Sequence, residues 1–317
     1  MAGSAGVSPA NLQRFGTALL HRGFKRAGET PALPASRKMR TAREIAQLAQ
    51  RACILEVCAR KPGNVSRDHD FSDTSFEDFL ISAIAIGPAL ENAAESRVGQ
   101  IIWQAASDTR RLVRPNTNLG LILLLAPLVK ACLGASCFGN MRQSLSSVLN
   151  ALSIEDARLA YAAIRLAQPG GLGQVSEADV AEEPSITLLR AMVLAQNRDS
   201  IASEYATGFS ITFEIGLPAL KQALSEGADL SNAAVQAYLT ILGRIPDTLI
   251  ARKRGFETAR QVSLHAREAL GSGGIFTSRG QEAILEMDKR LLDPSHTLNP
   301  GTTADLTGAA IFLVLIE

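Results

Sequence analysis

Apolar residues recur along most of the chain at the spacing of an amphipathic helix, and short polar segments separate these stretches. Ile45 and Leu55 belong to the first apolar stripe, which follows a capping box at residues 41–44. The proline after Lys61 cannot continue a helix, so we expect this first helix to end at about Ala59. Further helices are expected at about residues 74–84, 98–112, 119–132, 154–167, 199–213, 231–245, 257–270 and 279–292, and from near 304 onward.

A β-sheet is not expected from this pattern. Apolar and polar residues do not alternate over any long stretch rich in β-branched residues, and strand–turn–helix units of a parallel sheet are absent. The sequence also contains no Walker motif, no dinucleotide fingerprint and no regular repeat. We therefore predict an all-α fold, with a single multi-helix globular domain of about ten or more helices over residues 41–317.

Residues 1–40 differ in composition from the rest of the chain. They contain seven lysine and arginine side chains and a single acid, Glu29, together with many alanines and serines. No apolar stretch there is long enough for a secretory signal. Such a start is similar to a transit peptide, but we favour a disordered basic tail or an over-extended start upstream of Met39.

Overall composition narrows the class of protein. Hydrophobic residues make up 46% and charged residues 20% of the chain, which is ordinary for a soluble globular protein. The net charge of +1 argues against bulk binding to nucleic acid or to an anionic membrane. The apolar runs at 119–129 and 309–316 are too short to span a bilayer. We expect a cytoplasmic protein whose four cysteines are free thiols, at positions Cys53, Cys58, Cys132 and Cys137.

The segment from Ala59 to Asp73 has the strongest concentration of charge. Its fifteen residues include three basic side chains, three aspartates and a histidine, and a second capping box is expected directly after it at residues 74–77. This pattern is typical of a binding loop. The helix macrodipole alone also favours a lysine at a helix C-terminus and an aspartate at an N-terminus, so Asp73 has a second interpretation as a simple cap.

Four later polar segments have a similar design. Residues 116–118 precede an apolar helix, whose free N-terminal amides attract anions. The glycines of 169–173 permit close approach of the backbone to a ligand. An Asp-Thr pair at 247–248 lies one helical turn before two basic residues, and 299–303 opens the last helix. Taken singly, each segment is explained equally well as a cap, a helix end or a solvated surface.

Together these segments resemble the triphosphoribosyl-dephospho-CoA synthase family over roughly residues 42–317. The resemblance implies a mostly helical enzyme that uses ATP, dephospho-CoA and magnesium. It is carried by several spaced motifs in one order, which is more specific than any single motif. The motifs read Glu56-Val57, Lys61-Pro62-Gly63-Asn64-Val65 with Asp70, Asp73 and Phe79, Asn116-Thr117-Asn118-Leu119-Gly120, Pro169-Gly170-Gly171-Leu172-Gly173, Asp247-Thr248 with Arg252-Lys253, and Asn299-Pro300-Gly301-Thr302-Thr303-Ala304-Asp305-Leu306.

Two positions depart from the family pattern. Members commonly have His-Lys-Gly after Asn-Thr, where this chain has Asn118-Leu119-Gly120. Ser66 stands where an acidic residue or a histidine is common. The sequence therefore represents a divergent branch in which the acceptor substrate is the open question.

The implied chemistry assigns roles to individual residues. Carboxylates that bind Mg²⁺ are expected at Asp70 and Asp73, because hard cations prefer oxygen ligands. Asp247 and Asp305 are candidates for the catalytic carboxylate and base. We expect Lys61 to be exposed and Asp70 to lie too far from the next helix to cap it. The expected nucleotide- and phosphate-binding residues are Lys61, Asn64, Arg67, Asn116, Thr117, Asn118, Gly170, Gly171, Arg252, Lys253 and Thr302.

Three functions compete at this stage. The first is a transferase that uses ATP as a ribosyl donor, attaches a triphosphoribosyl group to dephospho-CoA and releases adenine. The second is a related transferase of the same fold with another phosphorylated acceptor in one-carbon coenzyme biosynthesis. The third is a non-catalytic helical nucleotide-binding protein, although carboxylates in several separate loops argue against it. Small-molecule substrates are the expected partners in the first two cases, and a homodimer is compatible with the sequence.

Overall fold

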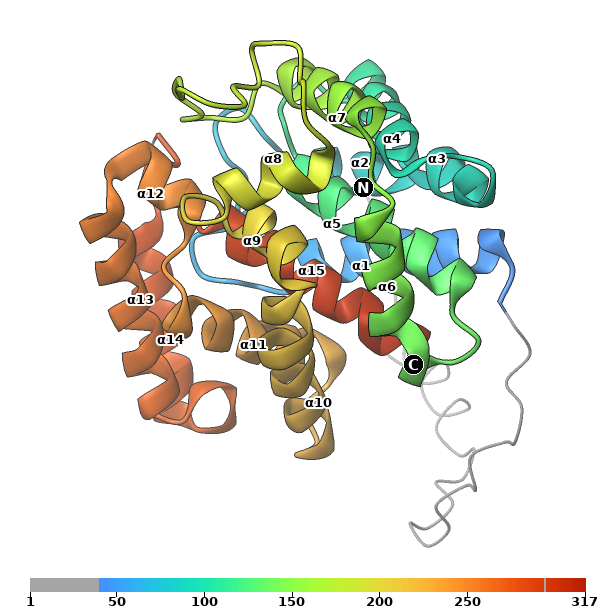
Figure 1. Cartoon of the computed structure of the whole chain (residues 1–317). Helices are drawn as coiled ribbons and strands as arrows, with labels where there is room; N and C mark the ends of the chain where they lie inside the picture. The colour runs from blue at the N-terminus through green and yellow to red at the C-terminus, as the bar shows by residue number, and fades with distance from the viewer. Residues whose placement is uncertain (1–39, 294) are drawn as a thin grey trace, which may run out of the picture. The chain divides into compact units, whose positions relative to one another are not determined.

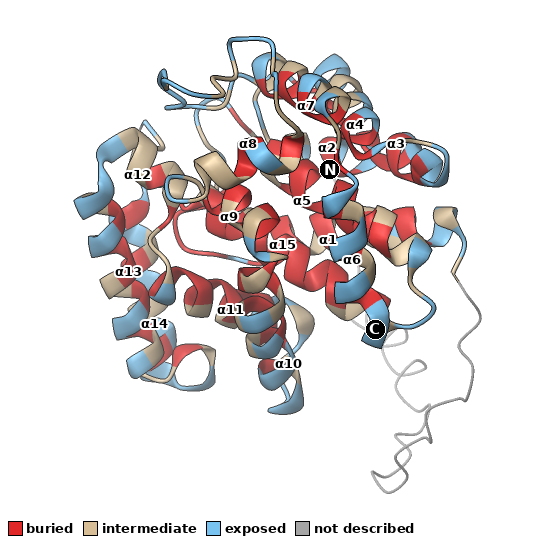
Figure 2. Cartoon of the chain, in the orientation of Figure 1, coloured by how far each residue is buried: buried red, intermediate tan, exposed pale blue. Residues whose placement is uncertain are grey.

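Helix α15, the last of the chain, forms the centre of the fold (Figures 1 and 2). The computed structural model describes residues 40–293 and 295–317. In it, α15 (Gly301–Ile316) is buried over most of its length. A helix that is apolar on all sides is stable in water only when protein covers every face. Its main packing partners are α1 (Ala42–Cys58), α5 (Leu119–Gly134), α10 (Leu217–Ser225) and α11 (Leu230–Arg244).

The N-terminal half of the described chain packs around α1 and α5. Its other helices are α2 (Phe76–Ala85), α3 (Gly87–Glu91), α4 (Val98–Leu112), α6 (Met141–Asn150) and α7 (Ile154–Ala167). Helices α4 and α7 lie side by side (Figure 1), and Gly99 permits this close approach. A Cβ atom there would lie 2.5 Å from Asp156 Cα, while the Gly99 N–H donates to Asp156 at 2.8 Å.

The C-terminal half adds further helices, of which α12, α13 and α14 lie together at the left of Figure 1. They are α8 (Leu188–Ala195), α9 (Ser200–Thr207), α12 (Thr248–Arg254), α13 (Phe256–Gly271) and α14 (Ser278–Leu291). Helix α13 packs against α11, α12 and α14. Short 3₁₀ turns occupy Asn92–Ala94, Phe138–Asn140 and Gly274–Phe276.

The helix expected over 199–213 is interrupted, so that prediction is wrong in its extent. Gly208 and Phe209 both have left-handed φ angles, of 67° and 63°, and they end α9. A π-helical segment, Thr212–Gly216, follows. The fully buried Glu204 carboxylate accepts the N–H groups of Ile211 at 2.7 Å and Thr212 at 2.9 Å. Burial raises the pKa of Glu204 to about 7. The Glu204 side chain thus caps the start of the new segment. The apolar spacing alone had predicted an unbroken helix.

The predicted all-α class is confirmed. Within the described ranges, β-pairing is limited to one isolated bridge between Ser66 and His69. The capping box at residues 41–44 is present, whereas the second box lies one residue later than expected, at Ser75 and Asp78. The reason is that the Thr74 carbonyl accepts from the Phe71 N–H and its hydroxyl donates to Asp73 at 3.0 Å, so Ser75 caps α2 instead.

The described residues belong to one compact unit. The basic tail or over-extended start expected at residues 1–40 lies, apart from Arg40, outside the described residues. Among the helices that the structure describes, none is long and apolar enough to cross a membrane.

Candidate active site

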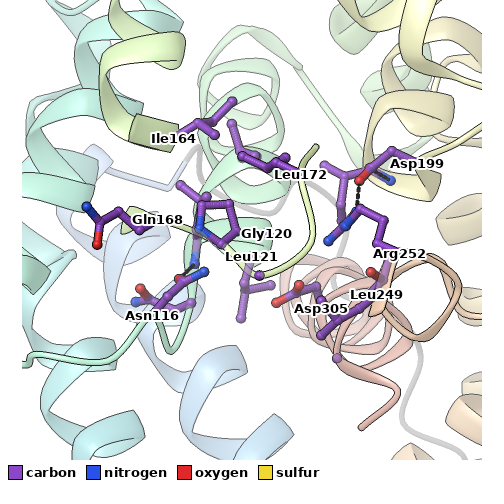
Figure 3. A pocket seen from close by; sticks show the side chains of 18 of the residues that line it. Asn116, Gly120, Leu121, Ile164, Gln168, Leu172, Asp199, Leu249, Arg252 and Asp305 are labelled. Atoms are coloured by element: carbon purple, nitrogen blue, oxygen red, sulfur yellow. Dashed lines mark hydrogen bonds and ion pairs between the residues drawn. The ribbon is translucent and has the colours of Figure 1, made fainter. Parts of the chain in front are cut away.

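A cavity of about 780 Å³ lies where several helix ends and polar loops meet (Figure 3). The C-terminal part of α1 and the first turns of α5 and α15 line one part of its wall. Residues of α12 and of the loop of 168–181 line other parts, together with residues of α2, α7, α8 and α9 and of the loops at 64–74, 115–118 and 295–299. These segments are far apart in the sequence, and the packing of α1, α5 and α12 around α15 brings them together. A concave site with convergent polar groups is the usual place for a small-molecule ligand.

Asp305 projects from the first turns of α15 toward the start of α5. Figure 3 shows its carboxylate beside Gly120 and Leu121. A Cβ atom on Gly120 would lie only 2.7 Å from Asp305 Cγ, so glycine makes room for the carboxylate. Burial raises the pKa of Asp305 well above its usual value, and the negative charges of Glu56 and Asp247 raise it further, while the Leu121 N–H opposes the shift. This acid therefore retains a proton more readily than an exposed aspartate.

Glu56 lies on the same wall of the cavity, near the C-terminus of α1. Its carboxylate Oε1 is 3.0 Å from the Lys61 ammonium, and both side chains are nearly inaccessible to solvent. Lys61 Nζ also donates to the carbonyls of Ala59, at 2.9 Å, and of Glu56. The expectation that Lys61 is exposed is therefore wrong, because the lysine folds back over the end of α1.

Asp247 connects two helix starts and does not line the cavity. Its Oδ1 accepts the N–H groups of Leu249 at 2.9 Å and Ile250 at 3.1 Å, which caps α12. Its Oδ2 accepts both the N–H and the hydroxyl of Thr303 at 2.7 Å, which caps α15. Burial raises the pKa of Asp247, and these donors oppose the shift. Because four donors occupy the carboxylate oxygens of Asp247, a structural role is favoured over proton transfer.

Two cations of α12, Arg252 and Lys253, line the cavity, and Figure 3 shows Arg252 paired with Asp199 close to Leu249. Arg252 forms an ion pair with Asp199, whose other oxygen caps α9 through the Ile201 N–H at 2.8 Å. Lys253 donates to the carbonyl of His296 at 3.1 Å. Burial, with the neighbouring Arg252 charge, lowers the pKa of Lys253. Both cations are thus held in place but still face the cavity.

The glycine-rich loop after α7 lies directly against these cations. A Cβ atom on Gly170 would be 3.1 Å from Lys253 Cε, and one on Gly171 would be 3.0 Å from Arg252 Cβ. Gly171 also has a left-handed φ of 75°. Two segments that the sequence separates by about eighty residues are therefore in contact, and glycine is needed at that contact.

The Asn-Thr-Asn segment forms the edge of the cavity before α5. Asn116 Oδ1 accepts the Leu119 N–H at 3.3 Å, and the Thr117 and Ser82 hydroxyls are 2.6 Å apart. Asn118 donates to the Ser82 carbonyl at 3.4 Å. The segment is tied to α2, and the Leu121 amide of the α5 N-terminus faces Asp305. The Asp305 carboxylate thus occupies part of the α5 N-terminus, where the sequence had predicted an anion-binding site.

The two aspartates expected to bind metal lie differently. Asp73 lines the cavity, whereas Asp70 does not. Asp70 Oδ1 accepts the Phe76 N–H at 2.7 Å, so the expectation that Asp70 is too far away to cap α2 is wrong. His296 stacks on Phe71 at 3.9 Å between ring centroids, and its Nε2 accepts the Ser72 N–H at 3.0 Å, which joins the two loops beside Asp73. In the described ranges, no group of three or more His, Cys, Asp or Glu side chains forms a ready-made metal cage.

Residues 42–317 match the ATP:dephospho-CoA triphosphoribosyl transferase family. The chain belongs to this family. Full-length relatives, provisionally named 2-(5''-triphosphoribosyl)-3'-dephosphocoenzyme-A synthases, agree with the match. The relative from Malonomonas rubra is 25% identical over 86% of this chain and 88% of its own length. That from Pseudomonas fluorescens strain Pf0-1 is 28% identical over 87% of this chain and 92% of its own.

Shorter and structural matches point to the same triphosphoribosyl transferase family. A relative from Pseudomonas fluorescens strain Pf-5 is 35% identical over 116 residues, which span 36% of this chain and 38% of that protein. A crystal structure from Archaeoglobus fulgidus, provisionally named a triphosphoribosyl-dephospho-CoA synthase, superposes with a TM-score of 0.59 at 28% identity. That comparison covers 75% of this chain and 98% of the solved chain. The chain is thus a member of a family of ATP-dependent transferases.

Within this triphosphoribosyl transferase fold, most of the residues singled out from the sequence converge on the cavity. Those that line it are Asn64, Asp73, Asn116, Thr117, Asn118, Gly170, Arg252, Lys253, Thr302 and Asp305. Those outside its lining are Lys61, Arg67, Asp70, Gly171 and Asp247. Arg67 is exposed and lies over the Phe76 ring, 5.5 Å from its centroid. Gly171 and Asp247 act on the site indirectly, through the contacts described above.

Sequence reasoning assigned no site role to several polar residues of the cavity, among them Glu56, Asp199 and His296. A signal existed for Glu56, because it is a charged residue on an otherwise apolar face of α1, next to the buried Cys53 and Val57. A helix was expected to begin at Asp199, and the side chain caps that helix in addition to pairing with Arg252. His296 had no sequence signal, because its contact with Phe71 depends on two distant loops meeting.

Proposed function

We propose that this chain transfers the triphosphoribosyl group of ATP to a hydroxyl group of dephospho-CoA and releases adenine. The bond between ribose C1′ and adenine breaks with its electron pair going to adenine, and a bond between C1′ and the acceptor oxygen forms. The hydroxyl proton ends, over the whole reaction, on the released adenine. The observation that carries the proposal is a single cavity that is lined both by two cations and by a partly buried carboxylate.

The cationic side is suited to the triphosphate. Arg252 and Lys253 lie next to the backbone of Gly170, where the absence of side chains lets a ligand approach closely. Arginine and lysine are the usual partners of phosphate oxygens. Thr302, whose hydroxyl is 3.3 Å from that of Thr248, adds a polar group nearby. Asn64 and residues 116–118 supply further polar groups on the cavity wall.

Asp305 is suited to proton transfer with the acceptor hydroxyl. A carboxylate whose pKa is raised by burial is a stronger base than an exposed one, and it is closer to the optimum for general acid–base catalysis near neutral pH. Asp247, the other candidate from the sequence, lies outside the cavity lining. We assign it the task of fixing the starts of α12 and α15, which hold Arg252 and Asp305 in place.

Magnesium would bind together with the triphosphate. Mg²⁺ typically takes one or two carboxylates plus phosphate oxygens and waters, and the carboxylate of Asp73 faces the cavity. We propose Asp73 as its protein ligand, with Asp70 supporting the loop by capping α2. When bound, the ion would neutralise phosphate charge; the protein residues would orient the ribose and move the proton.

Transfer to an acceptor other than dephospho-CoA is a second candidate function, and one observation supports it. Asn118 and Leu119 line the cavity at the position where the family commonly has histidine and lysine. Replacing a cation by leucine makes that part of the wall less suited to an anionic acceptor. The donor half of the reaction, in which ATP loses adenine, is the same for both candidates.

Product analysis tests the proposal. Purified protein with ATP, dephospho-CoA and Mg²⁺ is expected to release free adenine without forming ADP, AMP or pyrophosphate, as measured by chromatography. Formation of ADP would identify a kinase and refute the proposal. Adenine release with a related phosphorylated acceptor, but not with dephospho-CoA, would instead select the second candidate.

A further inference from the structure

Glu56 is a buried acid, and burying a carboxylate costs free energy because the charge loses its hydration. It lies on the face of α1 that also carries the buried Cys53 and Val57, and the residue is 7% exposed. It nevertheless lines the cavity, on the wall that also carries Asp305. Burial of an ion is tolerated when a partner compensates for the lost hydration.

Lys61 supplies that compensation, and all of its N–H donors are taken up by protein oxygens, so none is left for a ligand. An ammonium group has three N–H donors. Three protein oxygens surround that of Lys61, namely Glu56 Oε1, the Glu56 carbonyl and the Ala59 carbonyl. The side chain is 1% exposed and is absent from the cavity lining. Lys61 therefore fixes Glu56 and does not approach the triphosphate.

Two glycines make room for the two carboxylates of this wall. Gly120 leaves space for Asp305, as described above. Gly308 leaves room first for Leu121 and then for Glu56, because a Cβ atom there would lie 2.9 Å from Leu121 Cδ1 and 3.3 Å from Glu56 Cγ. Asp305 and Gly308 are separated by three residues, so they share one face of α15. The two carboxylates consequently converge on the strip between α1, α5 and α15.

We propose that Glu56 is a catalytic residue, which stabilises the positive charge that develops on the ribose, and that Lys61 is its positioning residue. The proposal rests on the transfer reaction proposed above. Loss of adenine gives the ribose ring oxocarbenium character, and a preorganised anion beside it lowers the barrier. Asp305 then acts on the acceptor proton, while Glu56 takes no part in proton transfer. No covalent bond to Glu56 forms or breaks.

A cationic ribose mimic tests this role without turnover. The probe is a triphosphate in which a pyrrolidine with a protonated ring nitrogen replaces the ribose. Wild-type protein is expected to bind the mimic more tightly than ATP. Glu56→Gln should weaken mimic binding about 10²-fold or more, which is the usual effect of removing one preorganised electrostatic group, and should change ATP binding only a few-fold. The rate of adenine release should fall by a similar factor.

Lys61→Met tests whether the lysine acts through Glu56. It should also reduce the preference for the mimic, and the double variant Glu56→Gln/Lys61→Met should lose no more than Glu56→Gln alone. The double variant also removes both buried charges, so it provides a folded protein if either single variant unfolds. Lys130→Met is the matched control, because Lys130, on α5, donates to the carbonyls of Ala93, Ala94 and Ser96 at 2.8 Å, away from the cavity. It should lower the melting temperature and leave the preference unchanged.

The outcomes separate the inference from the function on which it rests. If Glu56→Gln loses ATP and mimic binding equally, or keeps the full preference for the mimic, the proposal for Glu56 is refuted. Multiplicative losses in the double variant would refute the positioning role of Lys61. Absence of adenine release by the wild type, by contrast, refutes the proposed transfer reaction itself.

Discussion

At the scale of single residues, the buried Asp247 and the partly buried Asp305 differ in how fully their charge is compensated. Asp247 receives four hydrogen bonds from two helix starts. Asp305 has the Leu121 N–H beside it, and among the described residues it has no ion-pair partner. A carboxylate with many donors contributes to stability, whereas one with few keeps its reactivity at a cost in stability.

Asp305→Asn should therefore separate activity from stability. The amide keeps the size of the side chain but cannot accept a proton, so the rate of adenine release should fall by about 10²–10⁴-fold. The same change should raise the melting temperature by a few degrees at neutral pH, because it removes a buried charge. Activity assays and thermal unfolding on one preparation measure both effects.

The stability difference should depend on pH with a definite sign. The pKa of Asp305 is raised in the folded protein, so the folded state holds this proton to higher pH than the unfolded state does. The wild type then loses stability as pH rises from about 4, the ordinary aspartate value, toward the raised pKa. Asp305→Asn does not titrate, so its advantage should grow over that range. An unchanged difference between pH 4 and neutrality would contradict the assignment.

At the scale of elements, the sequence determined helices better than the contacts between them. Periodicity and caps are local, so the starts of α1, α7 and α11 were predictable to within about a residue. The break after α9 was missed because it depends on the buried Glu204 capping a later segment. Lys61 was misjudged for a related reason: a loop lysine is usually exposed, and only the folded loop places its ammonium against the end of α1.

Gly120→Ala tests the packing of α15 against the start of α5. In an exposed helix this change stabilises by about 1 kcal/mol. Here the added Cβ atom would overlap Asp305, so we expect lower stability and a slower reaction together. Gly271→Ala is the control, because a Cβ atom on Gly271, in α13, would meet no atom within 4 Å. A stable, fully active Gly120→Ala variant would show that Asp305 does not occupy this position in solution.

The loop before α2 gives a prediction about magnesium. Asp70 acts as a cap, and asparagine caps about as well as aspartate, so Asp70→Asn should behave nearly as the wild type. Asp73→Asn should keep the melting temperature and lose most of the magnesium dependence of ATP binding, because the amide brings no charge to the cation. Calorimetric titration of ATP at several Mg²⁺ concentrations measures this. Equal magnesium dependence in all three proteins would remove Asp73 from the metal site.

At the scale of the whole described molecule, α15 explains why the motifs of the sequence are spread from Glu56 to Asp305. Each motif lies at a helix end or loop, and the packing of α1, α5, α11 and α12 around α15 gathers these ends about one cavity. The convergence of Asn116, Gly170 and Arg252 was foreseeable from the resemblance. The ring contact of His296 and the pairing of Glu56 with Lys61 were not, because each follows from tertiary contacts between segments whose local sequence signals do not reveal them.

The central claim is that one cavity breaks the bond between adenine and ribose and passes the intact triphosphoribosyl group to an acceptor. ATP labelled separately in adenine and in the γ-phosphate tests it most directly, with dephospho-CoA and Mg²⁺ present. The account predicts one free labelled adenine for each acceptor molecule consumed, with the γ-phosphate label retained in the enlarged coenzyme product. The account would be contradicted if adenine stays bonded to ribose while the phosphate label appears in inorganic phosphate, in pyrophosphate or in a phosphorylated acceptor.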